Sequence, residues 1–508
     1  MACFFPSVSL ETWMLIVVFL SLFMLYGIWP YNLFKKIGVP GPMPLPFIGT
    51  LHGYRHGILE FDQRCSRKYG KIWGIFDGRQ PVMAILDLTM IKTILVKEFY
   101  TCFTNRRNFG LNGELDTALT VIADEHWKRI RTVLSPTFTS GRLKQMLPII
   151  NHYGQMLVKN IQKKMDNDEL ISTKEIFGAY SMDVVASTSF SVDIDSLNKP
   201  NDPFVLNVKK FLKFNLLNPF LLLSVIFPFF IPMLEKLRIG LVPNSVINYF
   251  IGVVKKIKED RQRNDHVNRV DFMQLMIDAQ ISGNTSDGEN SYKALTDKEI
   301  LTQAILFILA GYETTGSSLS FLSYCLATHP DVQHRLQEEI DEVLPNQATP
   351  TYDAVLQMEY LDMVVNETLR LYPPGGRLER ACKKTVEING VTIPKGTVAV
   401  IPVYVLHRDP GYWPEPEEFR PERFSKENRE VLDPYTFLPF GAGPRNCIAM
   451  RFALLVLKVG VVVLLQRFSF RVCKETPIPL ELDTKLFMQP KKPIKLKVAP
   501  RAVHEVKE

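Results

Sequence analysis

A short glycine- and proline-rich loop that ends in a cysteine constrains this chain more than any other stretch. It reads Phe440-Gly441-Ala442-Gly443-Pro444-Arg445-Asn446-Cys447, a composition that excludes regular structure. The apolar run 448–465 follows directly and is long enough for a buried helix. Cys447 is therefore expected where a loop enters a helix N-terminus. Free N–H groups and the positive end of the helix dipole favour a thiolate there.

The residues of this loop leave two interpretations open. A lone cysteine before a helix is commonly a buried structural residue. The glycines, however, let the backbone approach something flat and bulky. Arg445, two residues before the sulfur, can reach an anion beside it. The pattern Phe-x-x-Gly-x-Arg-x-Cys therefore favours a bound group over a structural thiol.

These residues resemble the haem-binding loop of the cytochromes P-450. The resemblance implies that Cys447 is the axial thiolate ligand of the iron of haem b, and that this thiolate favours O–O cleavage. The family usually has glycine two residues after the cysteine, where this chain has Ala449. The added methyl group is expected to shift redox potential or haem affinity slightly, without loss of haem.

Composition favours one large globular unit. The 508 residues contain no low-complexity linker and no internal repeat. The net charge of +7 suits an anionic membrane surface or an acidic protein partner, and no basic stripe for nucleic acid appears. The seven cysteines are scattered, which argues for a reducing compartment and against zinc or a disulfide framework.

The front of the chain predicts a membrane anchor. Residues 13–29 are almost wholly apolar and, with their flanks, about span a bilayer. A cleaved signal peptide is the alternative, but no Lys or Arg precedes Trp13. Lys35 and Lys36 follow the span and place the N-terminus in the lumen and the body in the cytosol. We expect an anchor at 1–30, a stiff proline-rich linker at 31–50 and one haem-thiolate domain at 51–508.

Further along, the patterns predict mainly helices and a small β portion. The expected elements are a hairpin of 72–76 with 82–86, helices at 124–134, 297–328, 331–344 and 352–372, a hairpin at 386–393 around Asn389-Gly390 and a strand at 397–405. The apolar stretch 211–232 is broken by prolines, so an interfacial segment is favoured over a transmembrane helix. Residues 255–269 are expected to be solvated, and 282–293 to form a mobile loop.

Thr296-Asp297-Lys298-Glu299 is a capping box that begins a long helix. This helix is apolar on nearly every face and carries Glu313 and Thr314 in its middle, where a carboxylate is costly unless paired or used. A transmembrane helix or a satisfied polar cluster would explain the pattern. The segment Ala310-Gly311-Tyr312-Glu313-Thr314-Thr315 also resembles the oxygen-activating groove of the family. That resemblance implies that Glu313 and Thr314 hold a water chain for proton delivery, and that Ala310 and Gly311 leave room for dioxygen and substrate.

Other site residues follow from the same resemblance. Trp127 and Arg131 share one helix face; an exposed amphipathic helix explains that pair equally well, whereas the family would use it for a haem propionate. The remaining propionate ligands would be Arg106, Arg380 and Arg445. Residues 109–121 align with the loop that roofs the substrate pocket. The pocket residues that the resemblance implies are Phe109, Thr120, Leu309, Ala310, Gly375 and Gly376.

A structural cluster is also implied. Glu367 and Arg370 lie three residues apart on one helix face, a pattern that occurs by chance in many helices. With Arg423 downstream they resemble the Glu/Arg/Arg cluster of the family, in which Arg423 would complete a bidentate network. Its role would be to hold the loop that leads to Cys447.

Several segments are similar to family 3, subfamily A, among them Leu309-Ala310-Gly311-Tyr312-Glu313-Thr314-Thr315 and Met358-Glu359-Tyr360-Leu361-Asp362-Met363-Val364. Membership implies an endoplasmic-reticulum monooxygenase for steroids, drugs and other lipophilic compounds. NADPH–cytochrome reductase would supply the electrons, with cytochrome b5 as a second donor in some members. Pro374-Gly375-Gly376 replaces a bulkier apolar triplet and is expected to reshape the pocket. A haem-thiolate isomerase of peroxides and a non-enzymatic membrane haem-binding protein stay as alternatives.

Overall fold

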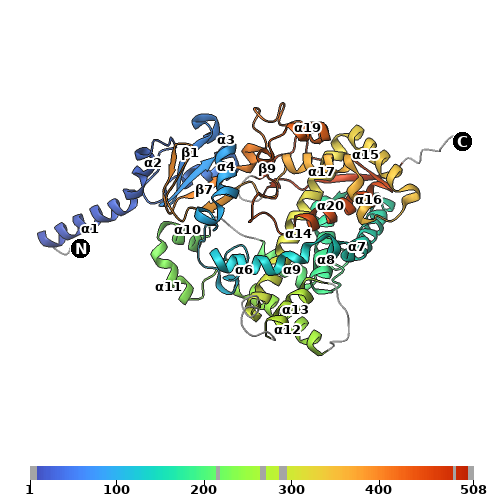
Figure 1. Ribbon diagram of the computed structural model, residues 1–508, viewed down its shortest axis with the longest axis horizontal. Coiled ribbons are helices and arrows are strands. Elements are labelled where there is room, and N and C mark those ends of the chain that lie inside the picture. Colours follow the sequence, from blue (N-terminus) through green and yellow to red (C-terminus); the bar gives the residue numbers. More distant parts are fainter. Residues whose placement is uncertain (1–8, 213–217, 264–270, 285–293, 484–487, 502–508) are drawn as a thin grey trace, which may run out of the picture.

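The protein is represented by a computed structural model that describes residues 9–212, 218–263, 271–284, 294–483 and 488–501. Within these ranges helices predominate and small sheets lie between them (Figure 1), as the sequence predicts. The α-helices are α1 (Leu10–Ile28), α2 (Leu33–Lys36), α3 (Ile58–Tyr69), α4 (Leu88–Lys92), α5 (Phe99–Cys102), α6 (Asp124–Leu134), α7 (Ser140–Asp166), α8 (Thr173–Phe190), α9 (Pro203–Phe211), α10 (Pro219–Ile226), α11 (Ile231–Lys236), α12 (Asn244–Arg263), α13 (Phe272–Asn284), α14 (Asp297–Thr328), α15 (Pro330–Val343), α16 (Tyr352–Gln357), α17 (Glu359–Leu371), α18 (Val403–Leu406), α19 (Lys426–Val431) and α20 (Met450–Leu465).

The largest sheet has the strand order β1-β2-β7-β4. Its hairpin confirms the predicted pair of runs, with Ile72 opposite Ile85, and β4 places Arg380 opposite Ala399. The strands of the structure are β1 (Ile72–Asp77), β2 (Gln80–Ile85), β3 (Ile171–Ser172), β4 (Leu378–Ala381), β5 (Val386–Ile388), β6 (Val391–Ile393), β7 (Val398–Ile401), β8 (Phe468–Arg471), β9 (Leu482–Asp483), β10 (Gln489–Pro490) and β11 (Lys495–Pro500). The predicted turn at Asn389-Gly390 joins β5 to β6.

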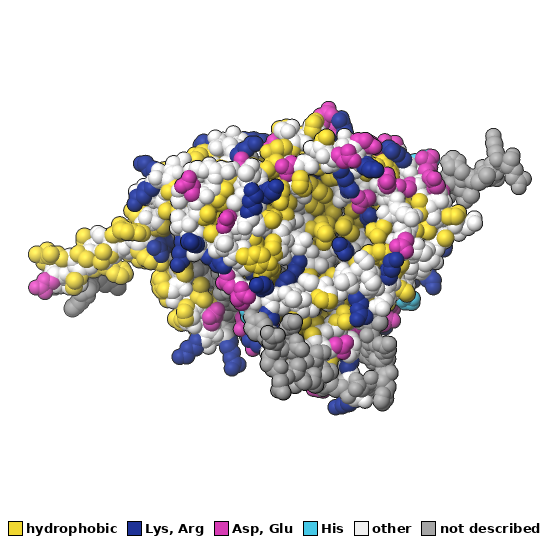
Figure 2. Space-filling model, in the orientation of Figure 1, with side chains coloured by type: hydrophobic (Ala, Val, Ile, Leu, Met, Phe, Trp, Pro, Cys, Tyr) yellow, Lys and Arg dark blue, Asp and Glu magenta, His cyan; other side chains and the backbone are white. Residues whose placement is uncertain are grey.

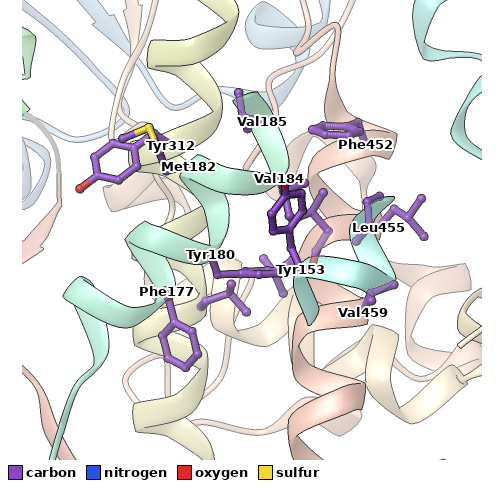
Figure 3. Packing of buried hydrophobic residues seen from close by; sticks show 14 of the residues in the cluster. Tyr153, Phe177, Tyr180, Met182, Val184, Val185, Tyr312, Phe452, Leu455 and Val459 are labelled. Carbon is purple, nitrogen blue, oxygen red and sulfur yellow. The ribbon is translucent and has the colours of Figure 1, made fainter. Parts of the chain in front are cut away.

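The main core lies between α7, α8, α14 and α20. Helices α8 and α14 approach so closely that a Cβ at Gly316 would lie 2.9 Å from the Cα of Gly178. The Tyr180 hydroxyl donates to the backbone oxygen of Val456 at 3.1 Å and ties α8 to α20. Figure 3 shows Tyr180 within this cluster. Since α14 is 61% buried over its most apolar window, its hydropathy reflects a core position and not a membrane span.

The capping box of α14 is present as predicted. The Thr296 side chain accepts from the N–H of Glu299, and the Glu299 carboxylate accepts from the N–H of Thr296. Helix α6 also has its predicted bounds. The start of α14 is encoded locally, which explains why the sequence places it correctly, whereas α6 has no side-chain cap at Ala123 and its first residue, Asp124, is held by Asn105 and Lys383.

Helix α1 projects away from the body (Figure 1), and Figure 2 shows apolar side chains along it. The most apolar 18-residue window of the segment Leu10–Lys36 has mean hydropathy 2.1 and is 6% buried, which fits a membrane anchor. Its body-proximal end is docked, because the Arg79 guanidinium lies 3.5 Å from the ring centre of Tyr26. The ring centres of Phe23 and Phe227 are 6.2 Å apart, so the predicted interfacial stretch lies beside the anchor.

The proline-rich segment lies against the sheet. The N–H of Gly74 donates to the backbone oxygen of Pro40 at 2.8 Å. Phe34 is 4% exposed, and a Cβ at Gly74 would meet its ring at 2.3 Å. The segment between α1 and α3 is therefore fixed to β1 over part of its length.

Some predicted elements are wrong in their extent. The helix predicted at 352–372 is two helices, α16 and α17, that break at Met358. The strand predicted at 397–405 ends at Ile401, and α18 begins after Pro402. Arg261, expected in a solvated stretch, is 5% exposed and pairs with Asp271 at 2.6 Å. Residues 264–270 and 285–293, and with them most of the predicted mobile loop, lie outside the described residues.

Candidate functional site

The loop that ends in Cys447 requires glycine at a specific point. Gly443 has a φ of 72°, and a Cβ there would lie 1.9 Å from the backbone oxygen of Leu95. The N–H of Cys447 donates to the oxygen of Phe440 at 2.9 Å and closes the loop. Helix α20 begins at Met450, so a short turn separates the cysteine from the helix that was expected directly behind it.

The Cys447 side chain has solvent-accessible surface, yet protein surrounds it on most sides. Burial raises the pKa of its thiol, while the N–H of Ala449 and the guanidinium groups of Arg131 and Arg106 act in the opposite direction. Burial therefore outweighs the predicted preference for a thiolate among the protein's own groups. A cation bound at the sulfur would supply the missing stabilisation of the charge.

Four arginines converge around this loop. Arg131 of α6 donates to the backbone oxygen of Asn446 at 3.0 Å and to its side-chain oxygen at 2.8 Å. Arg445 donates to the oxygen of Ile122 at 2.6 Å, and its guanidinium lies 4.6 Å from the ring centre of Trp127. A bridge between Asn105 and Ala381 places Arg106 beside the strand that carries Arg380. The predicted propionate ligands are therefore gathered in one region.

Among the described residues, carboxylates balance the charge of these arginines only in part, through Glu379 near Arg106 and Asp124 near Arg445. Arg380 is 1% exposed, and burial together with Arg106 and Arg445 lowers its pKa to about 9. The pKa of Arg445 falls to about 9 through burial and neighbouring arginines. Within the described chain, Nε and Nη2 of Arg380 and Nε of Arg445 have no hydrogen-bond partner. Buried guanidinium N–H groups require acceptors. The arrangement therefore fits a group that binds beside the cysteine and bears carboxylates for the arginines, as haem does with its propionates.

The middle of α14 presents an open face. Ala310 is exposed although its neighbours on the helix are mostly buried. The Thr314 hydroxyl donates to the backbone oxygen of Ala310 at 2.6 Å, on the same face. The missing side chain of Gly311 faces α8: a Cβ there would lie 2.5 Å from the Val185 side chain, so this glycine lets α8 approach closely.

Glu313 is ion-paired on the α8 side of the helix. Its carboxylate accepts from Lys174, and from Gln489 at 2.8 Å. Lys174 also donates to the Ser317 hydroxyl at 2.6 Å. A buried carboxylate requires a partner, and the structure supplies one that the sequence pattern did not identify. Glu313 and Thr314 are adjacent in the sequence but bind different neighbours.

The expected structural cluster is present with one change. Arg370, and not Arg423, holds the Glu367 carboxylate in a bidentate pair, at 2.7 and 2.8 Å. Arg423 adds one contact to that carboxylate at 3.3 Å. The side chains of Glu367 and Arg370 are fully buried. Arg370 also donates to three backbone oxygens, those of His407, Pro416 and Glu418.

His407 is a residue of this network that the sequence did not indicate. Its Nδ1 lies 3.2 Å from the backbone oxygen of Arg370, and its Nε2 accepts from the N–H of Leu438 at 2.8 Å. Burial lowers the pKa of His407 to about 3, so the ring is neutral at neutral pH. This ring connects the Glu367 cluster to the segment that enters the Cys447 loop. In the sequence, only its apolar flanking residues, Val405 and Leu406, indicated burial.

The predicted pocket residues fall into different environments. Ala310 and Thr120 are exposed, Phe109 is half-buried against the guanidinium of Arg107, and Leu309 belongs to the main core. A Cβ at Gly375 would meet nothing within 4 Å. At Gly376 a Cβ would lie 2.4 Å from the Leu59 side chain, so only Gly375 leaves open space.

Comparison with known proteins identifies the family of this chain. A family model described as Cytochrome P450 matches residues 39–498. Among similar proteins, Cytochrome P450 3A29 of Sus scrofa is 58% identical over 98% of each chain. Cytochrome P450 3A9 of Rattus norvegicus is also 58% identical over 98% of each chain, and Cytochrome P450 3A27 of Oncorhynchus mykiss is 56% identical over 99% of this chain and 97% of its own. The family model and the relatives of the 3A group show that this chain belongs to the cytochrome P450 family of haem monooxygenases.

Proposed function

We propose that this protein is a membrane-bound haem-thiolate monooxygenase of the endoplasmic reticulum that oxygenates steroids, drugs and other lipophilic compounds. The observation that carries the proposal is the arginine cluster beside Cys447, in which buried N–H groups of Arg380 and Arg445 have no acceptor among the described residues. It distinguishes a cofactor site from a structural cysteine. The groups would be Cys447 on the iron of haem b, and Arg106, Trp127, Arg131, Arg380 and Arg445 at the propionates.

Each part of the chain then has a defined task. When bound, haem supplies the reduction of dioxygen and the transfer of one oxygen atom to a C–H bond. The Thr314 hydroxyl lies on the open face of α14 and would pass a proton by exchanging its bond to the Ala310 oxygen. The Glu313 carboxylate, held by Lys174 and Gln489 on the α8 side, would first take up a proton from solvent water and then pass it toward that hydroxyl. Apolar walls would exclude bulk water.

Attachment to the membrane would suit a protein whose substrates are lipophilic. Helix α1 would anchor the protein with its body in the cytosol, because Lys35 and Lys36 follow the span. The exposed apolar side chains of Phe220, Phe229 and Met233 would dip into the bilayer interface beside it. Lipophilic compounds would then reach the pocket from the membrane. Electrons would come from NADPH through cytochrome reductase, with cytochrome b5 as an auxiliary donor.

A reconstituted membrane system tests the proposal. The wild-type protein is expected to give the reduced carbon monoxide spectrum of a thiolate-ligated haem and to hydroxylate steroids only with NADPH and reductase. Cys447→Ser should lose the spectrum and the activity, whereas Cys473→Ser, a half-buried thiol elsewhere, should keep both. Turnover of an organic peroxide without reductase, and no NADPH-dependent product, would instead identify an isomerase. Retention of activity in Cys447→Ser would refute the cysteine assignment.

A further inference from the structure

The loop that roofs the predicted pocket, residues 109–121, is attached to the N-terminal half of α14. The Thr302 hydroxyl lies 2.9 Å from the Thr117 hydroxyl and donates to the oxygen of Glu114 at 3.2 Å. At the rim, Lys298 and Asp116 form an exposed ion pair at 2.8 Å. Exposed ion pairs contribute little to stability. The buried hydrogen bonds therefore determine the position of the loop.

Gln303 makes the most specific of these contacts. Its amide nitrogen donates to the backbone oxygen of Thr117 at 2.7 Å, and its amide oxygen accepts from the N–H of Leu119 at 2.9 Å. The residue is fully buried. The loop around Leu119 has no regular structure, so its backbone groups lack ladder partners. One side chain therefore satisfies two of them and fixes the loop in one register.

The position of Gln303 on α14 gives this contact a functional meaning. Ala310 and Thr314 follow it by seven and eleven residues, which places each of them within about 20° of Gln303, on opposite sides of it, on one helix face. Gln303 is about 10 Å along the helix axis from Ala310. The loop covers this face at Gln303, and the same face is exposed at Ala310. The roof of the pocket is thus mounted on the helix face that carries the oxygen groove.

We propose that Gln303 is a specificity-determining positioning residue: its bidentate amide sets the height of the roof loop above the Ala310 face and so selects which carbon of a substrate is oxygenated. The inference rests on the proposed monooxygenase function. It assigns no chemical step to Gln303, which acts through the loop residues that it holds.

The test compares variants of two buried glutamines, Gln303 and Gln333, whose side-chain amides make the same kind of hydrogen bonds at different places in the fold. The amide nitrogen of Gln333 in α15 donates to the backbone oxygen of Phe470 at 3.0 Å, and its amide oxygen accepts from the N–H of Phe470 at 2.7 Å. Gln333 is also buried. Gln303→Leu and Gln333→Leu therefore remove equivalent bonds. Testosterone, which offers several oxidisable positions, is the probe, with the carbon monoxide spectrum as the measure of an intact haem site.

We expect Gln303→Leu to keep the spectrum, to change the ratio of hydroxylated products and to raise KM by roughly threefold to tenfold, as loss of one net hydrogen bond implies. Gln333→Leu should leave the ratio unchanged. Thr302→Val removes the Thr302 hydrogen bonds to the same loop and should shift the product ratio in the same direction. If Gln303→Leu does not fold, the inference is tested with Thr302→Val alone. An unchanged ratio in the folded roof variants, or an equal shift in Gln333→Leu, overturns the inference. Wild-type protein without NADPH-dependent product would overturn the proposed function instead.

Discussion

Lys174 of α8 donates to the Glu313 carboxylate of α14 and so provides the cation for a charge in the middle of an apolar helix. We expect Lys174→Met to lower the free energy of unfolding by ~1–2 kcal/mol, because the remaining carboxylate is 13% exposed and unpaired with a cation. The loss should be smaller than for a fully buried pair, since Lys174 is 30% exposed and solvent screens it. Urea denaturation measures it.

The matched control removes both charges. The double variant Lys174→Met with Glu313→Gln leaves no unpaired charge and should recover most of the lost stability. A double variant that is no more stable than Lys174→Met would show that the ion pair does not account for the effect.

The Thr314 hydroxyl is the polar group on the open face of α14 nearest to Ala310 in the chain. Thr314→Ala removes the hydroxyl that would pass protons, so more hydrogen peroxide should be released per NADPH consumed, several-fold above the wild type. Thr328→Ala is the control: Thr328 makes the same type of bond, to the oxygen of Tyr324 at 2.9 Å, near the end of the helix. Unchanged coupling in Thr314→Ala, or equal peroxide release from both variants, would contradict the proton role.

Local sequence encodes some of these elements and not others. The start of α14 is predictable because Thr296 and Glu299 cap each other within one turn. The start of α17 is not, because Glu339 of α15 accepts from the N–H groups of Tyr360 and Leu361 at 2.7 and 2.8 Å. A cap supplied by a residue about twenty positions earlier leaves no local pattern. The predicted helix 352–372 therefore ran through the break at Met358.

The site also has residues that the sequence indicates and pairings that only the fold shows. Resemblance to a known family pointed to Cys447 and Arg445 through one short, specific loop motif, whereas Arg106, Arg131 and Arg380 were only aligned with family positions and the fold brings them beside that loop. The pairing of Glu313 with Lys174, or of Arg370 with His407, joins residues distant in the chain, and residue types alone do not determine such partners. The pattern did indicate that a carboxylate in an apolar helix needs a partner; only the fold identifies it.

Ala449 contacts Cys447 through its backbone N–H. Its φ of −95° is accessible to any residue, and its contribution at the cysteine is the backbone N–H. Ala449→Gly should therefore keep the thiolate-type carbon monoxide spectrum unchanged in position. The variant should lose roughly 0.5–1 kcal/mol of stability through the greater freedom of glycine in the unfolded chain. A shifted Soret band would show instead that the alanine methyl group acts on the haem.

His407 should make the protein sensitive to acid. In the unfolded chain histidine takes up a proton near pH 6.5, whereas the folded protein keeps His407 neutral down to about pH 3. Between these values the unfolded state binds more protons, so stability falls as the pH falls, by as much as ~1.4 kcal/mol per pH unit. His407→Gln, whose amide can accept from the Leu438 N–H, should show a shallower decline in urea midpoint between pH 6.5 and 5, above the range in which most carboxylates titrate. His334→Gln, an exposed control, should decline as the wild type does. Equal slopes for His407→Gln and the wild type would mean that another group governs the acid response.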